Sequence, residues 1–335
     1  MKRPPMETVT MLPLTRVAVC GGTHGNELSG VYLVRELQKN DGGKAEEQGG
    51  AAETVSVLKV LSNPRAVQQC RRYMEKDLNR CFTNALLSTP AGKETLYEIV
   101  RAQELNALLG PKGSPKAVDL VCDLHNTTSN MGLCFISYSQ CNWIGPHIFR
   151  HLQAGATFHY THFREISSMP MRYIHLGGPS SEAYSLESVG KCGFGMEVGP
   201  QPHGVVRADI FSAMWDGVRL MLDWIRRFNA GTTFEGGEVE VYTMVKKMDF
   251  PRDPETESIT ATIHPELQDR DFRLLCPGDP LFLSFTGETQ RYEGEEPLYP
   301  LFVNEAAYYE KGIALWLARM TKMAFPPIRV KAGAE

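Results

Sequence analysis

Two histidines and a glutamate carry the most informative chemistry of this sequence. His24 and Glu27 stand three residues apart in the stretch Gly-Gly-Thr-His-Gly-Asn-Glu, and His125 stands far along the chain in Asp-Leu-His-Asn. Imidazole nitrogens and a carboxylate oxygen are ligands that zinc favours, and three protein ligands leave a fourth position for water. Zinc makes such a water molecule a nucleophile near neutral pH. The three residues therefore predict a catalytic zinc site and a hydrolytic reaction.

A short apolar run precedes each histidine. Residues 17–20 precede His24 and residues 118–122 precede His125, and both runs are typical of strands covered on both faces. In an open α/β sheet, ligands bind beyond the carboxyl ends of the strands. We therefore expect both histidines to lie just after their strands, at one edge of the sheet.

Three glycines shape the loop that carries His24. Gly21, Gly22 and Gly25 leave the turn free of Cβ atoms, so neighbouring backbone can pack closely against it. Apolar residues then recur at helical spacing, so we expect Asn26 to cap a helix and Glu27 to lie in its first turn. A glycine-rich turn of this kind can instead bind phosphate. However, it lacks the Lys-Ser/Thr ending of a P-loop and the Gly-x-Gly-x-x-Gly pattern of a dinucleotide site.

The composition limits the class of protein. The chain has 335 residues, of which 42% are hydrophobic and 22% are charged, so it can bury a full core and is long enough for two domains. Its net charge of -4 gives no electrostatic reason to bind nucleic acid or an anionic membrane. We expect neither a secretory signal nor a membrane span, because no apolar segment is long enough. Eight cysteines without a Cys-x-x-Cys pair favour free thiols in a reducing compartment.

The order of the expected elements indicates the fold class. Strand-like and helix-like segments alternate over the first two thirds of the chain, which predicts an α/β domain over residues 1–229 with a parallel or mixed sheet flanked by helices. From residue 230 the pattern changes to alternating strands and a hairpin turn, so we expect a smaller β-rich domain over residues 230–335. We also expect a surface loop at residues 40–53 and a frayed tail after Phe325.

Arginines form a second group of candidates. Arg71 and Arg72 precede Asn79 and Arg80 within a short polar segment. A guanidinium group suits a bidentate contact with a carboxylate and can stabilise a carbonyl oxygen that becomes anionic. Taken alone, such a cluster is more often a solvated basic turn.

Glu197 and Tyr308 are two further candidates. Glu197 interrupts an apolar strand, and a buried glutamate needs a reason to be there. It could be a general base beside a metal-bound water, or a partner in a structural ion pair. Tyr308 stands next to Tyr309, and such an aromatic pair is more often core packing than catalysis.

Five segments, in order along the chain, resemble the aspartoacylase family. They are Gly-Gly-Thr-His-Gly-Asn-Glu, Asp-Leu-Asn-Arg, Asp-Leu-His-Asn-Thr-Thr-Ser-Asn-Met-Gly, Glu-Val-Gly-Pro-Gln-Pro and Val-Asn-Glu-Ala-Ala-Tyr-Tyr-Glu-Lys, within residues 16–311. The resemblance implies a zinc-carboxypeptidase-like catalytic domain, a carboxy-terminal β domain that caps the active site, and one Zn2+ per subunit. The implied reaction is hydrolysis of an N-acyl amino acid to a carboxylate and a free amino acid.

The resemblance also implies a role for each candidate residue. The zinc ligands would be His24, Glu27 and His125, and the catalytic carboxylate would be Glu197. The substrate contacts would be Arg72 on the scissile carbonyl, Asn79 and Arg80 on the α-carboxylate, and Tyr308 from the second domain.

One position bears on the choice of substrate. In aspartoacylases proper, an arginine ten residues before the catalytic glutamate holds the β-carboxylate of N-acetylaspartate, and the same count lands on Glu187 here. A carboxylate there would repel that substrate. The stretch around Glu187 instead resembles the aminoacylase-3 branch of the family, whose substrates are N-acetylated aromatic amino acids and N-acetyl-S-cysteine conjugates (mercapturates). An insertion between residues 143 and 179 would let Arg164 or Arg172 replace the missing arginine.

Three other functions stay open at this point. The chain could be an aspartoacylase acting on N-acetyl-L-aspartate, or a non-catalytic binding protein on the same fold. It could also be a carboxypeptidase, which would need room for a peptide chain that a capping domain restricts. The resemblance implies a homodimer or homotetramer in the cytoplasm, and it allows peripheral association with the apical membrane.

Overall fold

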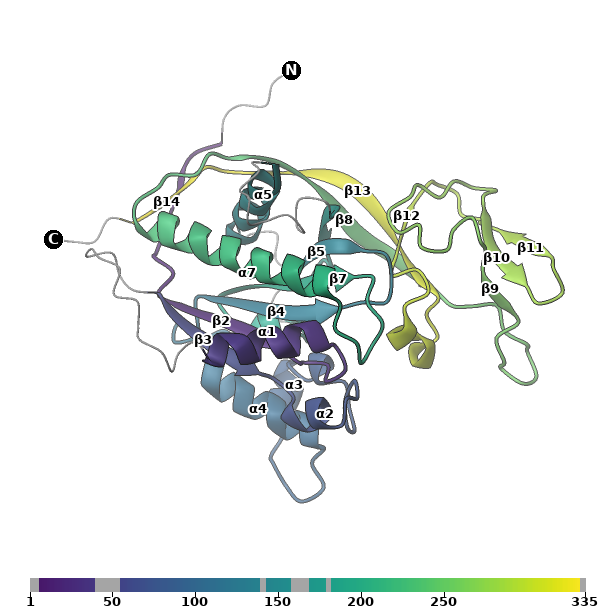
Figure 1. The fold of residues 1–335 in the computed structure, drawn as a ribbon, viewed down its shortest axis with the longest axis horizontal. Helices are drawn as coiled ribbons and strands as arrows, with labels where there is room; N and C mark the ends of the chain where they lie inside the picture. The colour runs from purple at the N-terminus through teal and green to yellow at the C-terminus, as the bar shows by residue number, and fades with distance from the viewer. Residues whose placement is uncertain (1–5, 40–54, 139–142, 158–168, 179–181, 332–335) are drawn as a thin grey trace.

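A mixed β-sheet runs through the centre of the molecule (Figure 1). The computed structural model describes residues 6–39, 55–138, 143–157, 169–178 and 182–331, so the loop expected at 40–53 and Arg164 lie outside the described residues. Within these residues the sheet has nine strands, in the order β12 (Tyr299–Leu301), β13 (Leu315–Phe325), β8 (Gly237–Met248), β6 (Met171–His175), β5 (Gly132–Ser137), β7 (Cys192–Gly199), β4 (Leu120–Asn126), β2 (Arg16–Gly21) and β3 (Ser56–Leu61).

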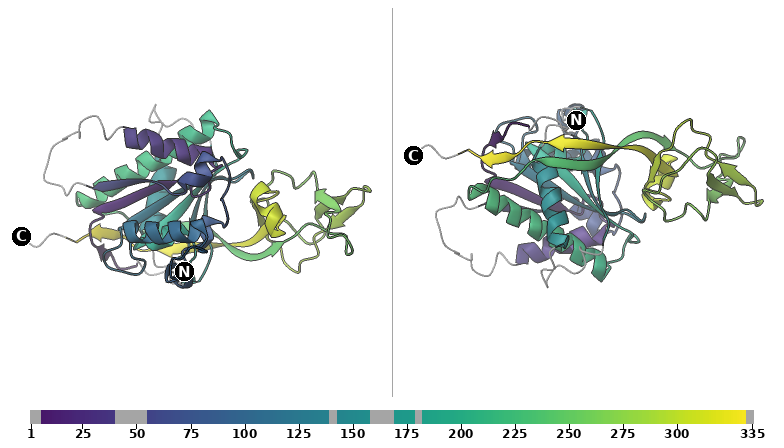
Figure 2. Two further views of the ribbon diagram at one scale, coloured as in Figure 1. Left: turned by 90° about the horizontal axis from the view of Figure 1, so that it is seen from below. Right: turned by 90° about the horizontal axis from the view of Figure 1, so that it is seen from above.

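Helices cover both faces of this sheet, as the two views of Figure 2 show. One face packs on α1 (Leu28–Lys39), α5 (Ile144–Thr157) and α7 (Ala208–Asn229). The other face packs on α4 (Tyr97–Leu109) and on the short helices η2 (Leu78–Arg80) and η4 (Leu186–Val189). Two further short helices are α2 (Pro64–Gln68) and α3 (Asn84–Leu87). The predicted α/β fold with a mixed sheet is confirmed.

The central strand β4 explains how an apolar run can present catalytic side chains. Successive residues of a strand point to opposite faces of the sheet. Leu120, Cys122 and Leu124 therefore enter the core on the face covered by α1 and α7, whereas Asp123 and His125 point to the opposite face. His125 lies inside β4, one residue before its end, and not after the strand as the sequence analysis expects.

The start of α1 also differs from the expectation. The helix begins at Leu28, so Asn26 does not cap it and Glu27 precedes its first turn. The first turn is capped from another strand, because the side chain of Asn126 accepts a hydrogen bond from the backbone N–H of Ser29 at 3.2 Å. This arrangement leaves the carboxylate of Glu27 free to turn towards the two histidines.

The last third of the chain contributes both to the central sheet and to a small lobe. Strands β8 and β13 pair with each other in antiparallel fashion, and β8 also pairs with β6. Between them, β9 (Ala261–Ile263), β10 (Pro280–Ser284) and β11 (Thr289–Arg291) form a three-stranded sheet with a separate apolar core. Figure 1 shows this lobe projecting beyond one end of the central sheet. The domain boundary near residue 230 stays a prediction.

The chain ends are held together by a further pair of strands. Strand β1 (Val9–Met11) pairs in parallel with β14 (Ile328–Val330), and Ile328 is fully buried. The expectation of a frayed tail after Phe325 is therefore wrong for these residues. Backbone hydrogen bonds to β1 hold residues 328–330 in place. This segment is too short for its sequence to predict a strand.

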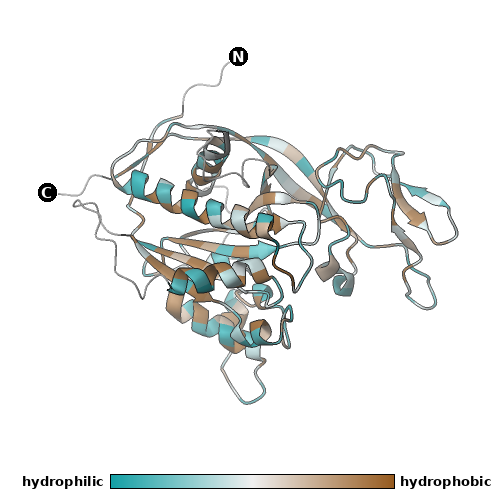
Figure 3. Cartoon of the chain, viewed as in Figure 1, coloured by the Kyte–Doolittle hydropathy of each residue, from teal (hydrophilic) through white to brown (hydrophobic). Residues whose placement is uncertain are grey.

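The distribution of hydrophobic residues agrees with this layering (Figure 3). Along α7, brown hydrophobic positions alternate with teal hydrophilic ones, as expected of a helix with one face on the core. None of the helices in the described ranges combines the length and the apolar character needed to cross a membrane.

Candidate metal and substrate site

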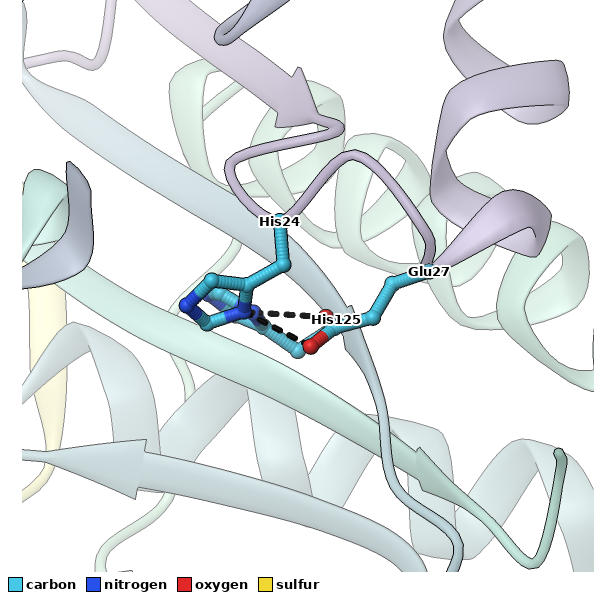
Figure 4. Close-up of side chains that lie close together, drawn as sticks. All are labelled: His24, Glu27 and His125. Atoms are coloured by element: carbon cyan, nitrogen blue, oxygen red, sulfur yellow. Dashed lines mark hydrogen bonds and ion pairs between the residues drawn. The ribbon is translucent and has the colours of Figure 1, made fainter. Parts of the chain in front are cut away.

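The side chains of His24, Glu27 and His125 converge on one point (Figure 4). Glu27 Oε1 lies 2.7 Å from His24 Nδ1, and Glu27 Oε2 lies 3.0 Å from His125 Nδ1. The two Nδ1 atoms are themselves 3.2 Å apart. All three side chains are buried. Two imidazoles and a carboxylate from loops and strands far apart in sequence thus present their donor atoms to a shared position.

A second layer of carboxylates holds the two histidines. His24 Nε2 lies 3.0 Å from Asp77 Oδ1, and His125 Nε2 lies 2.8 Å from Asp123 Oδ2. Asp123 is in turn fixed by a hydrogen bond of 2.7 Å from the hydroxyl of Thr23. Histidines that bind metals usually engage a carboxylate or carbonyl with their other ring nitrogen. The sequence analysis did not identify either aspartate.

The electrostatics of this cluster suit a cation. Burial opposes ionisation of Glu27, but His24 and His125 outweigh it and hold the pKa of Glu27 well below its ordinary value. Burial also acts against protonation of His125, yet Asp123 and Glu27 raise its pKa well above the ordinary value. The residues therefore fit a metal ion, since three converging donors are oriented by carboxylates that carry compensating negative charge.

The glycines of the first loop allow this close packing. A Cβ atom on Gly25 would lie 2.1 Å from the backbone carbonyl carbon of Ala66, and Gly22 has a φ of +71°. Both values exclude a larger residue unless the backbone moves. The loop before Glu27 can therefore lie directly against the backbone of α2, as the glycine pattern predicts.

Arg72 lies beside the metal-binding cluster. Its Nη1 donates to Glu27 Oε1 at 3.1 Å, and its Nη2 lies 3.6 Å from Asp77 Oδ2. Its buried Nε has no hydrogen-bond partner among the described residues. Burial lowers the pKa of Arg72, but Glu27 and Asp77 outweigh it and raise the pKa overall, so the guanidinium stays charged. Arg71, in contrast, is exposed.

Asn79 and Arg80 line the same cavity from η2. The side-chain oxygen of Asn79 accepts a hydrogen bond of 3.0 Å from the backbone of Leu186, which fixes the direction of its amide. The guanidinium of Arg80 lies 4.6 Å from the centre of the Tyr184 ring, and its Nη1 donates to the carbonyl of Asn79. A flat aromatic support of this kind holds an arginine while leaving other N–H groups available.

Glu197 stands beside His125 on the neighbouring strand. The two residues are register partners in the parallel pair of β4 and β7, so their side chains emerge on the same face. Burial is the largest influence on Glu197; His125 opposes it and Glu27 reinforces it, and together they raise the pKa of Glu197 to about 8. A carboxyl group in this position can exchange a proton near neutral pH. Among the described residues, no structural ion pair of Glu197 is found that would explain its place.

Tyr308 reaches the cavity from the carboxy-terminal part of the chain. It belongs to η5 (Ala306–Lys311), and its ring stacks on Trp316 of β13 with centroids 5.7 Å apart. The preceding residue Glu305 is buried and accepts hydrogen bonds from the backbone N–H of Thr128 at 2.8 Å and from its hydroxyl at 3.0 Å. Glu305 therefore attaches η5 to the loop that follows β4, and the sequence analysis missed it.

All eight predicted site residues line one cavity that opens to solvent. Gly195 and Glu197 of β7 are among its lining residues. Gly195 has no side chain there, and a Cβ atom would lie 3.8 Å from both His125 Cδ2 and Ile136 Cβ. Glu187 lies over β7 at a point two residues before Gly195, because the backbone of Glu187 lies against Gly193.

Glu187 faces this cavity, which the sequence alone left open. It is 4% exposed, its Oε1 accepts from the hydroxyl of Ser185 at 2.6 Å, and its Oε2 has no partner among the described residues. Burial and Asp123 raise its pKa. Arg172 does not replace the missing arginine, since its guanidinium lies over Phe272 at 5.1 Å and outside the lining of the cavity.

A mixed sheet covered by helices on both faces thus carries a His-Glu-His cluster that could hold a metal ion. Residues 13–225 match the family model described as the succinylglutamate desuccinylase/aspartoacylase catalytic domain, and residues 237–320 match the AstE/AspA barrel-sandwich hybrid domain. The chain therefore belongs to the succinylglutamate desuccinylase/aspartoacylase family. The resemblance seen in the sequence motifs is confirmed, and so is the class of enzyme, a hydrolase.

Similar proteins in this family carry two names, N-acyl-aromatic-L-amino acid amidohydrolase and aspartoacylase. An N-acyl-aromatic-L-amino acid amidohydrolase (carboxylate-forming) B of Danio rerio is 55% identical over 97% of this chain and 99% of its own length. The Homo sapiens protein named N-acyl-aromatic-L-amino acid amidohydrolase (carboxylate-forming) is 50% identical over 90% of this chain and 89% of its own length. The crystal structure of murine aminoacylase 3 superposes with a TM-score of 0.86 at 42% identity, covering 95% of this chain and 99% of the other.

Proposed function

We propose that this protein is a zinc-dependent amidohydrolase that deacetylates N-acetyl aromatic amino acids and N-acetyl-S-cysteine conjugates. The single observation that carries the proposal is the convergence of His24, Glu27 and His125 beside Glu197 in one cavity. Zinc held by those three residues would polarise the acyl carbonyl and lower the pKa of a water molecule to about 7. The names of the similar proteins support the substrate class.

The chain's own residues supply the remaining steps. Glu197 accepts a proton from the attacking water on its carboxylate and then passes it to the departing nitrogen, as its position beside His125 allows. Arg72 stabilises the negative charge that develops on the acyl oxygen, and its charge is maintained by Glu27 and Asp77. Losing one such donor typically lowers the rate by about 100- to 1,000-fold.

Arg80 and Asn79 would hold the α-carboxylate of the substrate. Arg80 is supported by the ring of Tyr184, and the Asn79 amide is fixed by Leu186. Tyr308 adds an aromatic wall from η5, and the carboxy-terminal segment thereby caps the active site. Arg72 and Arg80 are the two arginines among the described residues that line the cavity, and Arg72 already contacts Glu27 and Asp77. No third arginine lines the described part of the cavity to bind a second carboxylate of the substrate. This favours an uncharged side chain over that of aspartate.

The direct test compares substrates. Purified protein should hydrolyse N-acetyltyrosine and an S-substituted N-acetylcysteine with a higher kcat/KM than N-acetyl-L-aspartate. Preference for N-acetyl-L-aspartate would make the protein an aspartoacylase. Zinc binding without hydrolysis of any of the three would identify a non-catalytic binding protein. On the family resemblance we also propose a cytoplasmic homodimer or homotetramer, which light scattering of the purified protein tests.

A further inference from the structure

The segment η5 is attached to the catalytic part of the chain at three places. Glu305 accepts hydrogen bonds from Thr128, the hydroxyl of Tyr73 donates to Glu310 at 2.9 and 2.8 Å, and Lys311 Nζ lies 2.7 Å from Asp77 Oδ2. The third contact differs from the other two. Asp77 is the carboxylate that holds His24, so the contact joins η5 directly to the metal-binding cluster.

Asp77 divides its two oxygens between different partners. Oδ1 lies 3.0 Å from His24 Nε2 and accepts a hydrogen bond of 3.0 Å from the backbone N–H of Asn79. Oδ2 faces Lys311 at 2.7 Å and Arg72 Nη2 at 3.6 Å. Lys311 is therefore its nearest cation. Asp77 is only 7% exposed, so bulk water cannot freely replace a lost partner.

Lys311 is itself held in place. Its side chain is 25% exposed, and its ammonium lies 5.7 Å from the centre of the Tyr308 ring. A lysine that is three quarters covered and placed over an aromatic ring loses much of the freedom that makes surface ion pairs weak. The contact with Asp77 is thus a fixed part of the site and not a solvated surface pair.

We propose that Lys311 is a positioning residue for the metal ion. It fixes the carboxylate of Asp77, which keeps His24 oriented so that Nδ1 points towards Glu27 and His125. The proposal rests on the proposed zinc site and extends it, because it makes metal retention depend on the seating of a helix that also carries Tyr308. The same element then both lines the substrate cavity and secures the metal.

The size of the effect follows from the distance to the metal. Removing a group that touches a metal-bound histidine typically costs 10- to 100-fold in metal affinity, and we expect that loss for Asp77→Asn. Lys311 acts one contact further away. We therefore expect Lys311→Met to weaken zinc affinity, and to speed zinc release, by about 3- to 10-fold, with most of the loss recovered in Lys311→Arg.

The experiment measures zinc release from the full chain. Zinc-loaded wild type, Lys311→Met, Lys311→Arg, Asp77→Asn and Tyr73→Phe are mixed with an excess of a chromogenic chelator, and the affinity is obtained by competition. Tyr73→Phe is the matched control, because it removes another anchor of η5 without touching Asp77. It should release zinc like the wild type. Thermal melting of the zinc-free variants reports folding, and Lys311→Gln replaces Lys311→Met if the latter does not fold.

Two results would overturn the inference. One is zinc release from Lys311→Met at the wild-type rate while Asp77→Asn releases it faster. The other is an equal acceleration in Lys311→Met and Tyr73→Phe, which would assign the effect to loosening of η5 in general. A wild-type chain that takes up no zinc would instead refute the proposed function, and the inference with it.

Discussion

Gly195 lines the cavity beside His125 and Glu197, and adding one methyl group there tests whether the substrate side chain lies against it. In Gly195→Ala the new Cβ would lie 3.8 Å from His125 Cδ2, 3.8 Å from Ile136 Cβ and 4.0 Å from the carbonyl oxygen of Asp123. These are ordinary van der Waals separations, so the variant should fold without strain. The methyl group would nevertheless add to the cavity lining two residues before Glu197. One methylene in such a pocket changes discrimination by about 10- to 200-fold.

We expect this loss to depend on the size of the substrate side chain. The kcat/KM for N-acetyltryptophan and N-acetyltyrosine should fall at least about 10-fold, whereas that for N-acetylalanine should change little. Release of free amino acid measures the rates, and a series of formyl, acetyl and propionyl derivatives of tyrosine serves as the control. A uniform loss across all side chains would refute the reasoning, as it would place the effect on His125. Sensitivity to acyl length alone would place the acyl group, and not the side chain, over Gly195.

Three further substitutions give separate outcomes. Glu187→Arg should raise turnover of N-acetyl-L-aspartate relative to N-acetyltyrosine, and an unchanged ratio would show that position 187 does not contact the substrate. Glu197→Gln should keep zinc but lose about 100- to 10,000-fold in kcat, measured beside zinc content, whereas retained activity would exclude Glu197 as the proton carrier. Burial acts to raise the pKa of Glu305, but contacts with His203 and Thr127 outweigh burial and lower this pKa to about 2. The contribution of Glu305 to the stability of the fold is therefore complete above the ordinary pKa of a glutamate, and it is lost as the pH falls through about 2. Glu305→Gln should therefore lower the urea midpoint at pH 7, and its difference from the wild type should shrink towards pH 3; a constant difference would contradict this.

The sequence singled out the three residues that converge in the structure, because each histidine stands at or near the end of an apolar run and Glu27 stands three residues after the first histidine. His24 follows a strand and sits in a glycine turn that only small residues allow, and this part of the prediction needed no tertiary information. The position of Glu27 could not be derived so well. Helix patterns placed it in the first turn, but the turn is capped by Asn126 from β4, a partner that local sequence does not reveal.

The carboxylates behind the histidines show where sequence reasoning stops. Asp123 had a usable signal, since it stands two residues before His125 and must share its face of the strand. Asp77 stands in the quoted Asp-Leu-Asn-Arg segment, but its contact with the histidine could not be derived, because it meets His24 across 53 residues of chain, and Lys311 meets Asp77 across 234. Contacts of this kind depend on how η2 and η5 pack over the sheet. They become visible only when the fold is known.

Glu187 illustrates a prediction that was useful but incomplete. Counting back from Glu197 placed an acidic residue near the substrate, and the structure places it in the cavity. Simple repulsion is not the whole reason that it disfavours a second carboxylate. Its pKa is raised by burial, and the nearest cationic side chains of the cavity already face Glu27 and Asp77 or the Tyr184 ring. The absence of a free cationic side chain in the described cavity lining therefore disfavours a second substrate carboxylate at least as much as the negative charge of Glu187 does.

The most direct test of the account is the position of the metal ion itself. Crystals of the protein grown with zinc should give one anomalous-scattering peak at the zinc edge, about 2.0 to 2.2 Å from Nδ1 of His24, Nδ1 of His125 and the carboxylate of Glu27. A peak at that place would establish the ligand set from which the proposed hydrolysis follows. A peak elsewhere, or none at this cluster in protein that hydrolyses N-acetyltyrosine, would contradict it.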